Sequence, residues 1–303
     1  MFKIKRTQKV VLLKLLSLFS SIRGYNILVI ILAQYLTSIY ILAPHLPLRK
    51  VVFDLNLFVL VLASALAIAG GYIINNFYDE EKDVINRPIK TKLDGYIKQR
   101  TKLHTYFIFN FLSVVLASYV SFRAVLFFSI YIFGIWFYSH KLKKYAFVGN
   151  ITASILAVVP FFAVFIYYRN FDYVIFVHAT FLFLIISMRE VVKDLENLKG
   201  DLVQNYQTIP VKYGVPFSKK MLTLIALLTL IPVSLLITKF QLGYMDYYFY
   251  GSVILLVLFC VFLWKSNSKI QYVLLHNFLK FIIVIGVFSI VLIDVNLLLN
   301  RIL

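Results

Sequence analysis

Long apolar runs alternate along the chain with shorter polar and charged segments. Nine of these runs reach roughly the 18 residues that a helix needs to cross a bilayer. They cover residues 26–44, 53–74, 105–122, 124–139, 149–168, 173–188, 221–238, 247–264 and 277–299. Only Phe122 and Arg123 join the third and fourth runs, so a tight hairpin is expected there. The pattern predicts an all-α integral membrane protein with nine transmembrane helices.

A basic segment precedes the first run. Residues 1–25 carry six Lys and Arg around the apolar stretch VVLLKLLSLF. An Ala-x-Ala cleavage site is absent from this segment, because the first Ala of the chain is Ala33. The segment is therefore predicted to be a basic amphipathic helix at the membrane interface and not a signal peptide. We expect an arm over residues 1–25 and a single nine-helix domain over residues 26–303.

Composition supports the membrane prediction. The chain is 61% hydrophobic with a mean hydropathy of +0.87, and only 15% of its residues are charged, against about 25% in soluble domains. Its one cysteine, Cys260, lies inside a predicted span, which excludes a disulfide framework.

The formal net charge of +18 is distributed unevenly along the chain. Of the 31 Lys and Arg, 24 fall in the N-terminal arm and in the loops after the even-numbered runs, and six fall on the other side. This bias places the N-terminus and those loops in the cytoplasm and the C-terminus outside. Topology and anionic membrane lipids account for the basic excess, so no nucleic-acid partner is expected. We place the chain in a bacterial cell membrane.

The acidic residues gather in two of the loops predicted to be cytoplasmic. Of 13 Asp and Glu, nine lie in the loops after the second and sixth runs. They are Asp79, Glu80, Glu81, Asp83, Asp94, Glu190, Asp194, Glu196 and Asp201. Acidic residues contribute little to membrane orientation, so this clustering indicates a chemical need for carboxylates on the cytoplasmic side.

The first acidic cluster has helical spacing. Asn75, Asp79 and Asp83 stand at positions i, i+4 and i+8. Each four-residue step on an α-helix turns about 40° beyond a full circle. The three side chains therefore share one face if the second span continues as a helix.

The second cluster, in REVVKDLENLKGD, repeats the arrangement. Glu190, Asp194, Asn197 and Asp201 stand at positions i, i+4, i+7 and i+11, again on one helical face. Gly200 is expected to weaken the end of that helix.

Two stripes of oxygen ligands could face each other across a cavity, where their charges repel unless a cation neutralises them. Mg²⁺ takes oxygen ligands and is usually held by one or two carboxylates together with phosphates and water. Nearby Lys and Arg would bind the remaining phosphate oxygens. The sequence thus predicts a Mg²⁺–diphosphate site. The alternative is a pair of solvated loops balanced by cations such as Lys82 and Lys193.

Other chemistries find little support in the sequence. The five His are dispersed, and one Cys cannot form a zinc cluster. The G-x-x-x-x-G-K-[ST] motif does not occur, so nucleotide hydrolysis is not expected.

The two motifs together resemble those of the UbiA superfamily of intramembrane prenyltransferases. That family carries N-x-x-x-D-x-x-x-D after its second helix and a D-x-x-x-D-type motif after its sixth, on a nine-helix fold. The likeness includes RGYN (Arg23–Asn26), NRP (Asn86–Pro88), YSHKLKKYAFVGN (Tyr138–Asn150) and QTIPVKYG (Gln207–Gly214). It covers nearly the whole chain.

The resemblance implies a central apolar chamber that opens at the cytoplasmic side. There, Mg²⁺ would bind a polyprenyl diphosphate donor, and a lipid or aromatic acceptor would capture the allylic cation. The residues it assigns to the metal are Asn75, Asp79, Asp83, Asp194, Asn197 and Asp201, and the four Asp among them are catalytic. The candidates for substrate contacts are Arg23, Asn26, Arg87, Tyr138, Lys141, Lys143 and Arg189, with Asn75 and Asn197. Glu190 is an outer candidate.

Two departures from the family pattern stand out. Relatives often read K-D-I-E-D-I-E-G-D in the second motif, whereas this chain has KDLENLKGD. Asn197 therefore offers a carbonyl oxygen without charge where an Asp is usual. After NRP, relatives often continue with another Arg-Pro and a Ser-Gly, whereas this chain reads IKTKLDG, so its cap loop is expected to differ.

The sequence indicates the chemical class of the acceptor less clearly than it indicates the Mg²⁺–diphosphate site. REVVKDLENLKGD is most similar to members that alkylate geranylgeranylglyceryl phosphate, and it is also similar to members that prenylate homogentisate. A non-enzymatic carrier or scaffold would place acids deep in the spans, and these spans are almost free of charge. A phosphatidyltransferase would need a D-G-x-x-A-R-type motif, which the chain lacks. A further alternative, raised by Asn197, is a protein of this family that has lost its activity.

Overall fold

The computed structural model describes residues 6–240 and 242–294, and the regular structure of these residues is helical. Nine helical segments in the described ranges are long and apolar enough to cross a membrane. They are α2 with η1 (Gly24–Leu42), α4 (Leu55–Tyr78), α7 (Gln99–Val120), α8 (Phe122–His140), α9 (Val148–Tyr168), α10 (Tyr173–Val203), α11 (Ile209–Lys239), η3 with α12 (Gly243–Lys265) and α13 with η4 (Lys269–Ile293). The shorter helices are α1 (Arg6–Ser21), α3 (Leu48–Val52), α5 (Glu80–Asn86), α6 (Pro88–Asp94) and η2 (Leu142–Lys144). The prediction of a multi-pass, all-α membrane protein is confirmed.

Several helix boundaries differ from the predicted ones. The hairpin between α7 and α8 turns at Ser121, whose hydroxyl accepts a hydrogen bond from the backbone of Ala124 at 3.1 Å and caps α8. Helix α11 begins at Ile209, twelve residues before the predicted run, and bends at Gly214 (φ 84°, ψ 165°). The apolar pattern missed these residues because helical hydrogen bonding continues into polar sequence beyond the hydrocarbon-length run. The predicted end of the ninth run, from residue 295, lies outside the described residues.

The chain divides into two compact units. The first takes in the chain up to Ile31 and the stretch Val59–Lys141. The second takes in Leu32–Phe58 and the chain from Leu142 onward. Each unit is thus assembled from two separate stretches of sequence.

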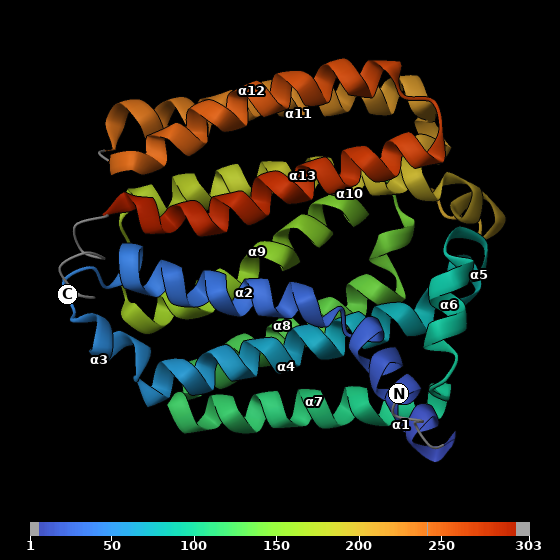
Figure 1. Cartoon of the computed structure of the whole chain (residues 1–303), viewed down its shortest axis with the longest axis horizontal. Coiled ribbons are helices and arrows are strands. Elements are labelled where there is room, and N and C mark those ends of the chain that lie inside the picture. The colour runs from blue at the N-terminus through green and yellow to red at the C-terminus, as the bar shows by residue number, and fades with distance from the viewer. Residues whose placement is uncertain (1–5, 241, 295–303) are drawn as a thin grey trace, which may run out of the picture. The chain divides into compact units, whose positions relative to one another are not determined.

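In the first unit, α7 and α8 approach α4 closely (Figure 1). A Cβ atom on Gly70 would lie 2.7 Å from the Asn110 side-chain oxygen, and one on Gly71 would lie 2.9 Å from Ile135 Cγ2. Both contacts are too short for any larger residue without a shift of the neighbour. Glycine at these two positions therefore lets α7 and α8 pack tightly against α4, the helix that leads into the first acidic motif.

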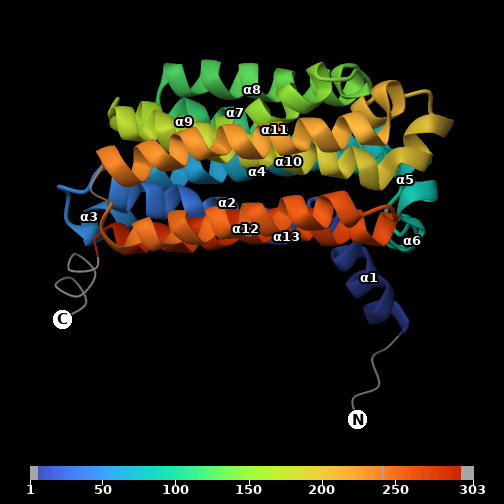
Figure 2. The same ribbon diagram turned by 90° about the horizontal axis from the view of Figure 1, so that it is seen from above.

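In the second unit, α10 packs against α9, α11 and α13. Figure 2 shows α10, α11, α12 and α13 running nearly parallel within this unit. The Gln34 side chain of α2 donates a hydrogen bond to the carbonyl of Pro160 in α9 at 2.8 Å. The early stretch Leu32–Phe58 is therefore tied by buried polar contacts to helices that follow more than 100 residues later.

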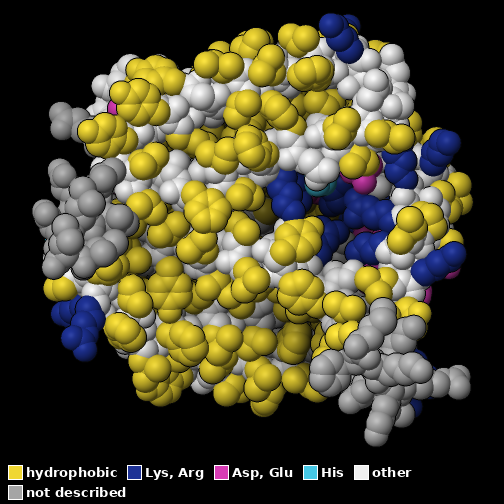
Figure 3. Space-filling view, viewed as in Figure 1, with side chains coloured by type: hydrophobic (Ala, Val, Ile, Leu, Met, Phe, Trp, Pro, Cys, Tyr) yellow, Lys and Arg dark blue, Asp and Glu magenta, His cyan; other side chains and the backbone are white. Residues whose placement is uncertain are grey.

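Hydrophobic side chains cover most of the face that Figure 3 shows. In the middle of the spans, Ile130 of α8 is 71% exposed and Ile254 of α12 is 63% exposed. Backbone groups inside these helices bond within the helix, as a bilayer requires. Exposed apolar faces of this kind fit hydrocarbon as their surroundings.

Candidate active site

The first acidic motif lies where α4 passes into α5, within the first unit. The backbone N–H of Asp79 donates to the carbonyl of Asn75 at 3.0 Å, and that of Asp83 donates to Asp79 at 2.7 Å. Asp79 itself departs from helical geometry (φ −94°, ψ 4°), which separates α4 from α5. The i to i+4 bonding nevertheless continues through the motif. The three side chains therefore start from one face of a nearly continuous helical run, as their spacing predicts.

The same segment ends at Arg87. Its backbone N–H donates to the Asp83 carbonyl at 2.7 Å, and its own backbone (φ −142°) leaves the helix before Pro88 starts α6. Asn75, Asp79, Asp83 and Arg87 are all partly exposed, so a ligand can reach them.

The second motif lies on one unbroken helix. Helix α10 runs to Val203, so Asp194, Asn197 and Asp201 share one of its faces. Gly200 does not end the helix, because its carbonyl still accepts a bond from the Gln204 backbone at 3.1 Å. The expected weakening at Gly200 therefore leaves the ligand stripe intact.

Neighbouring elements of the second unit orient this stripe. Asn150 of α9 donates its side-chain amide to Asp194 Oδ2 at 2.8 Å. Thr208, the N-cap of α11, donates its hydroxyl to Asp201 Oδ2 at 3.3 Å. Asp201 is fully buried and Asn197 is 4% exposed, whereas Asp194 is partly exposed. Sequence reasoning did not select Asn150 or Thr208 for the site, although both lie in stretches that carry the family resemblance.

Lys143 lies in the second unit beside the loop that follows α10. The backbone of Gln207 donates to the Lys144 carbonyl at 2.8 Å. Gly149 opens α9 so close to this turn that a Cβ atom there would lie 3.2 Å from Lys143 Cα. Lys143 is buried at 8% exposure, an unusual place for a charge that serves only membrane topology. Tyr138 and Lys141 end α8 in the first unit.

Other predicted contact residues also have defined neighbours. In the first unit, the Arg23 guanidinium lies 5.0 Å from the centre of the Tyr72 ring, and Asn26 donates to the Tyr72 hydroxyl at 3.3 Å. In the second unit, Arg189 Nε donates to His276 Nε2 at 3.4 Å. In each case one partner lies on a helix with an acidic motif: Tyr72 on α4 and Arg189 on α10.

Glu190, the outer candidate, forms an ion pair with Lys193 at 2.8 Å on the same helix. Lys193 therefore already neutralises the Glu190 carboxylate, which precedes the stripe that starts at Asp194. Its role as a metal ligand is not favoured by this contact.

The donor chemistry fits Mg²⁺. Carboxylate and amide oxygens are hard ligands of the kind this ion prefers. Among the described residues, no three Asp, Glu, His or Cys side chains converge to form a complete metal site by themselves. A Mg²⁺ ion held by one or two carboxylates with phosphate oxygens does not need such a cluster.

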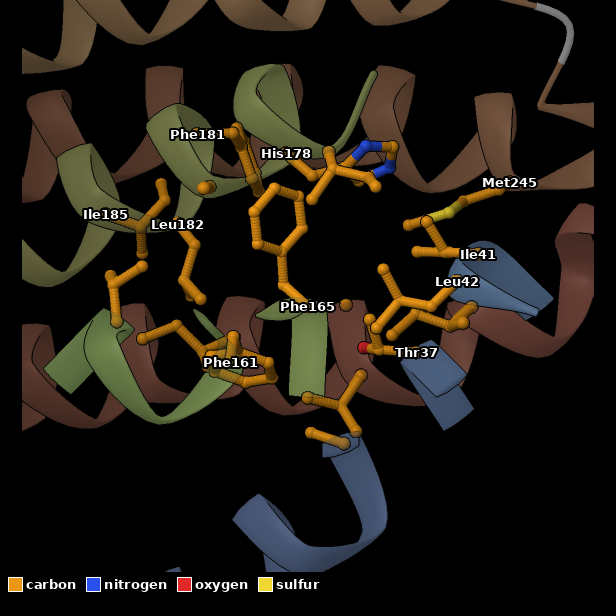
Figure 4. Close-up of a pocket in the computed structure, with 18 of the residues that line it drawn as sticks. Thr37, Ile41, Leu42, Phe161, Phe165, His178, Phe181, Leu182, Ile185 and Met245 are labelled. Carbon is orange, nitrogen blue, oxygen red and sulfur yellow. The ribbon is translucent and has the colours of Figure 1, made fainter. Parts of the chain in front are cut away.

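An apolar pocket lies in the second unit along the first half of α10 (Figure 4). Counting its open mouth, it encloses about 870 Å³ of empty space. Helices α2, α9, α10, α12 and α13 line it with side chains that include Phe161, Phe165, Phe181, Leu182 and Ile185. Ile185 precedes Asp194 by nine residues, or about 14 Å along the helix axis. The same helix thus offers an apolar pocket in one half and oxygen ligands in the other.

Comparison with known proteins extends over nearly the whole chain. The model of the UbiA prenyltransferase family matches residues 12–299. A digeranylgeranylglyceryl phosphate synthase from Thermococcus gammatolerans is 32% identical over 215 residues, which cover 70% of this chain and 76% of that protein. The synthase of the same name from Methanobrevibacter smithii is 27% identical and covers 65% of this chain and 69% of its own.

Solved structures share the fold. A structure described as giving insights into digeranylgeranylglyceryl phosphate synthase in membranes has a TM-score of 0.70 at 24% identity. It covers 92% of this chain and 98% of its own. A UbiA homologue from Archaeoglobus fulgidus, bound to GPP and Mg²⁺, has a TM-score of 0.64 at 15% identity, covering 91% of this chain and 99% of its own.

Proposed function

The chain belongs to the UbiA prenyltransferase family, and on that premise we propose that it transfers an isoprenyl group from a polyprenyl diphosphate to a geranylgeranylglyceryl phosphate-type acceptor within the membrane. The observation that carries this proposal is the pair of oxygen-ligand stripes, Asn75–Asp79–Asp83 and Asp194–Asn197–Asp201. The names of the similar synthases support the lipid acceptor over an aromatic one.

In this proposal the chain acts as one prenyltransferase domain, and each stripe supplies oxygen ligands for Mg²⁺ bound to diphosphate. Bound Mg²⁺ would neutralise charge on the diphosphate as it leaves with the electron pair of the allylic C–O bond. Asp79, Asp83, Asp194 and Asp201 would hold the metal. Support for Mg²⁺ comes from the ligand chemistry of the stripes and from the A. fulgidus homologue solved with GPP and Mg²⁺.

The cationic side chains would bind the phosphate oxygens that the metal leaves free. Lys143 and Arg87 are the strongest candidates, because one is buried beside the loop after α10 and the other ends the segment with the first motif. Tyr138, Arg23 and Asn26 remain proposed substrate contacts on the strength of the resemblance. Lys141 and Arg189 remain candidates because they are cations predicted to lie on the same side of the membrane as the acidic motifs. Such preorganised charges act where negative charge develops on the leaving group.

The apolar pocket of the second unit would receive the isoprenyl tail. Its aromatic and aliphatic lining excludes water, which would otherwise capture the allylic cation before the acceptor does. The oxygen of the acceptor hydroxyl would bond to the allylic carbon, and its proton would pass to the released diphosphate.

We also propose a membrane orientation with the N-terminus and both acidic loops in the cytoplasm and the C-terminus outside. The distribution of Lys and Arg supports it, with 24 on one side against six on the other. The similar synthases come from archaea, and the comparisons do not favour a bacterial membrane.

The deciding experiment uses purified protein in nanodiscs with radiolabelled geranylgeranyl diphosphate and Mg²⁺. Geranylgeranylglyceryl phosphate, homogentisate, 4-hydroxybenzoate and dihydroxynaphthoate would be supplied one at a time. We expect labelled product with the glyceryl phosphate, and none in EDTA. Product with homogentisate alone would instead assign an aromatic prenyltransferase. A chain that neither forms product nor retains the labelled diphosphate would refute the proposal.

Asn197→Asp is expected to strengthen Mg²⁺ binding. It adds a carboxylate between Asp194 and Asp201, and affinity for divalent ions rises with the charge of the ligands. The Mg²⁺ concentration for half-maximal rate should fall about tenfold, an order-of-magnitude figure for a ligand change. In EDTA the same variant should melt at a lower temperature than wild type, because three like charges then repel one another.

The matched control is Asn205→Asp. It adds the same charge nearby at an exposed residue with left-handed backbone (φ 53°), which Asn and Asp tolerate alike. An equal shift in both variants would mean that general surface charge, and not the second motif, changes the response to Mg²⁺.

A further inference from the structure

Two short helices hold part of the first motif. Helices α5 and α6 have seven residues each, too few to be stable without tertiary contacts. Asp83 lies within α5, and Arg87 lies between the two helices. The segment joins α4 at Asp79, where the backbone leaves helical geometry while i to i+4 bonds continue on both sides, so this junction is the point at which the run can bend, and we call it the hinge. Contacts further along the segment must therefore fix its position.

Asp94 supplies these contacts. It ends α6 and is 3% exposed. Its Oδ1 accepts a hydrogen bond from the Ser21 hydroxyl of α1 at 3.2 Å. Its Oδ2 accepts from the Asn76 amide of α4 at 3.0 Å and pairs with Lys90 at 3.0 Å. One carboxylate thus joins α1, α4 and α6.

A buried lysine extends the network. Lys102, in the first turn of α7, donates to Asn76 Oδ1 at 3.0 Å and is 3% exposed. A buried ammonium group is costly unless an opposite charge compensates it. Asp94, on the other side of the same Asn76 amide, supplies most of that charge, and Glu80 supplies the rest. We call Ser21, Asn76, Lys90, Asp94 and Lys102 the Asp94 clasp.

The clasp occupies a stretch in which this chain departs from its family's usual pattern. Lys90 and Asp94 belong to IKTKLDG, where relatives often have Arg-Pro and Ser-Gly. In the structure these two residues form an ion pair between the partly exposed Lys90 and the buried Asp94.

We propose that Asp94 is a positioning residue for Mg²⁺ and diphosphate binding. The clasp anchors α6 to α4 beside Asn75, so that Asp83 and Arg87 keep a fixed position relative to Asn75 and Asp79. Without it, α5 and α6 turn about the hinge at Asp79 and the ligands of the first motif separate. What these positions do for substrate rests on the proposed function.

The first test is Asp94→Asn, which keeps the side-chain volume and removes the charge. The Mg²⁺ concentration for half-maximal rate and the KM for geranylgeranyl diphosphate should each rise about tenfold, as for residues that orient metal ligands. At saturating Mg²⁺ and substrate, kcat should fall by less than about threefold, because the reacting groups are intact. A lower kcat with unchanged Mg²⁺ dependence would overturn the proposal.

A second-site variant gives a sharper test. Asp94→Asn removes the larger of the two opposite charges that compensate the buried Lys102, and Glu80 is the one that remains. Adding Lys102→Met removes the ammonium charge of Lys102 and keeps an apolar side chain of similar length. Buried ion pairs often tolerate such a replacement. The double variant should recover at least part of the Mg²⁺ affinity lost in Asp94→Asn. A double variant that binds Mg²⁺ more weakly than Asp94→Asn would contradict the clasp.

The third readout does not need enzyme activity. A spin label at Ile89→Cys, in a Cys260→Ser background, reports on α6, because Ile89 is 85% exposed. Asp94→Asn should increase the mobility of this label, and an unchanged spectrum would overturn the proposal. If wild type shows no transfer and the label still loosens in Asp94→Asn, the proposed function fails while the clasp stands.

Asp54→Asn is the matched control. Asp54 accepts hydrogen bonds from the Asn56 backbone at 3.0 Å and from the Tyr167 hydroxyl at 2.7 Å, in the second unit. Asp54→Asn should change neither the mobility of the spin label at position 89 nor the Mg²⁺ dependence of the rate. If Asp94→Asn does not fold, Ser21→Ala removes one neutral bond of the clasp and should shift both readouts in the same direction. No shift in Ser21→Ala would then count against the clasp.

Discussion

Replacing Asp79 by Asn is expected to reduce isoprenyl transfer by about 100- to 1,000-fold, the usual effect of removing one preorganised electrostatic contact to a transition state. Asp79 stands in the middle of the first stripe, at the junction of α4 and α5. The amide keeps the shape of the side chain and loses the charge that would bind Mg²⁺. Initial rates with labelled geranylgeranyl diphosphate would measure the loss.

Glu81→Gln provides the comparison for Asp79→Asn. Glu81 follows two residues after Asp79, is exposed, and lies off the stripe. It should keep activity within about twofold of wild type, as surface substitutions usually do. Equal losses in both variants would mean that net charge at the membrane surface matters, and the first stripe would lose its assigned role.

Replacing Asp194 by Asn is expected to cost about 100-fold or more in transfer rate, on the same electrostatic grounds. Asp194 is the partly exposed carboxylate of the second stripe, and the Asn150 amide holds it at 2.8 Å. Its loss should also raise the Mg²⁺ requirement. Asn150→Ala removes the orienting bond and leaves the charge, so its loss should be smaller, at about tenfold.

Asp172→Asn makes the same chemical change at the other end of α10. Asp172 is exposed and accepts no side-chain capping bond, so its replacement should leave the rate nearly unchanged. If Asn150→Ala costs as much as Asp194→Asn, the effect of both arises from a disturbed packing of α9 against α10. If neither variant changes the rate, the second motif has no part in transfer.

The sequence predicted the parts of this fold that depend on local pattern. Apolar length located all nine spans, and four-residue spacing placed both acidic stripes on helical faces. In each case the residues that form the sequence pattern lie within the same few turns of the helix that the pattern predicts. The one-face arrangement of Asp194, Asn197 and Asp201 follows from α10 alone.

The contacts that orient these stripes were not predicted, because they join residues far apart in sequence. Ser21 and Asp94 are 73 residues apart, and Asn150 and Asp194 are 44 residues apart. Charge counting also gave no indication that Lys102 and Lys143 are buried.

The division of the second unit between two stretches has a consequence for its synthesis. Leu32–Phe58 leaves the ribosome before residues 59–141, yet its partners lie beyond them, as in the bonds of Gln34 to Pro160 and Asp54 to Tyr167. At about 5–20 residues per second, translating the intervening stretch takes on the order of 4–17 seconds. For that time the early stretch, with the buried amide of Gln34, has none of these partners in the bilayer. Chaperones of membrane insertion, or the translocon itself, would have to shelter it until α9 emerges.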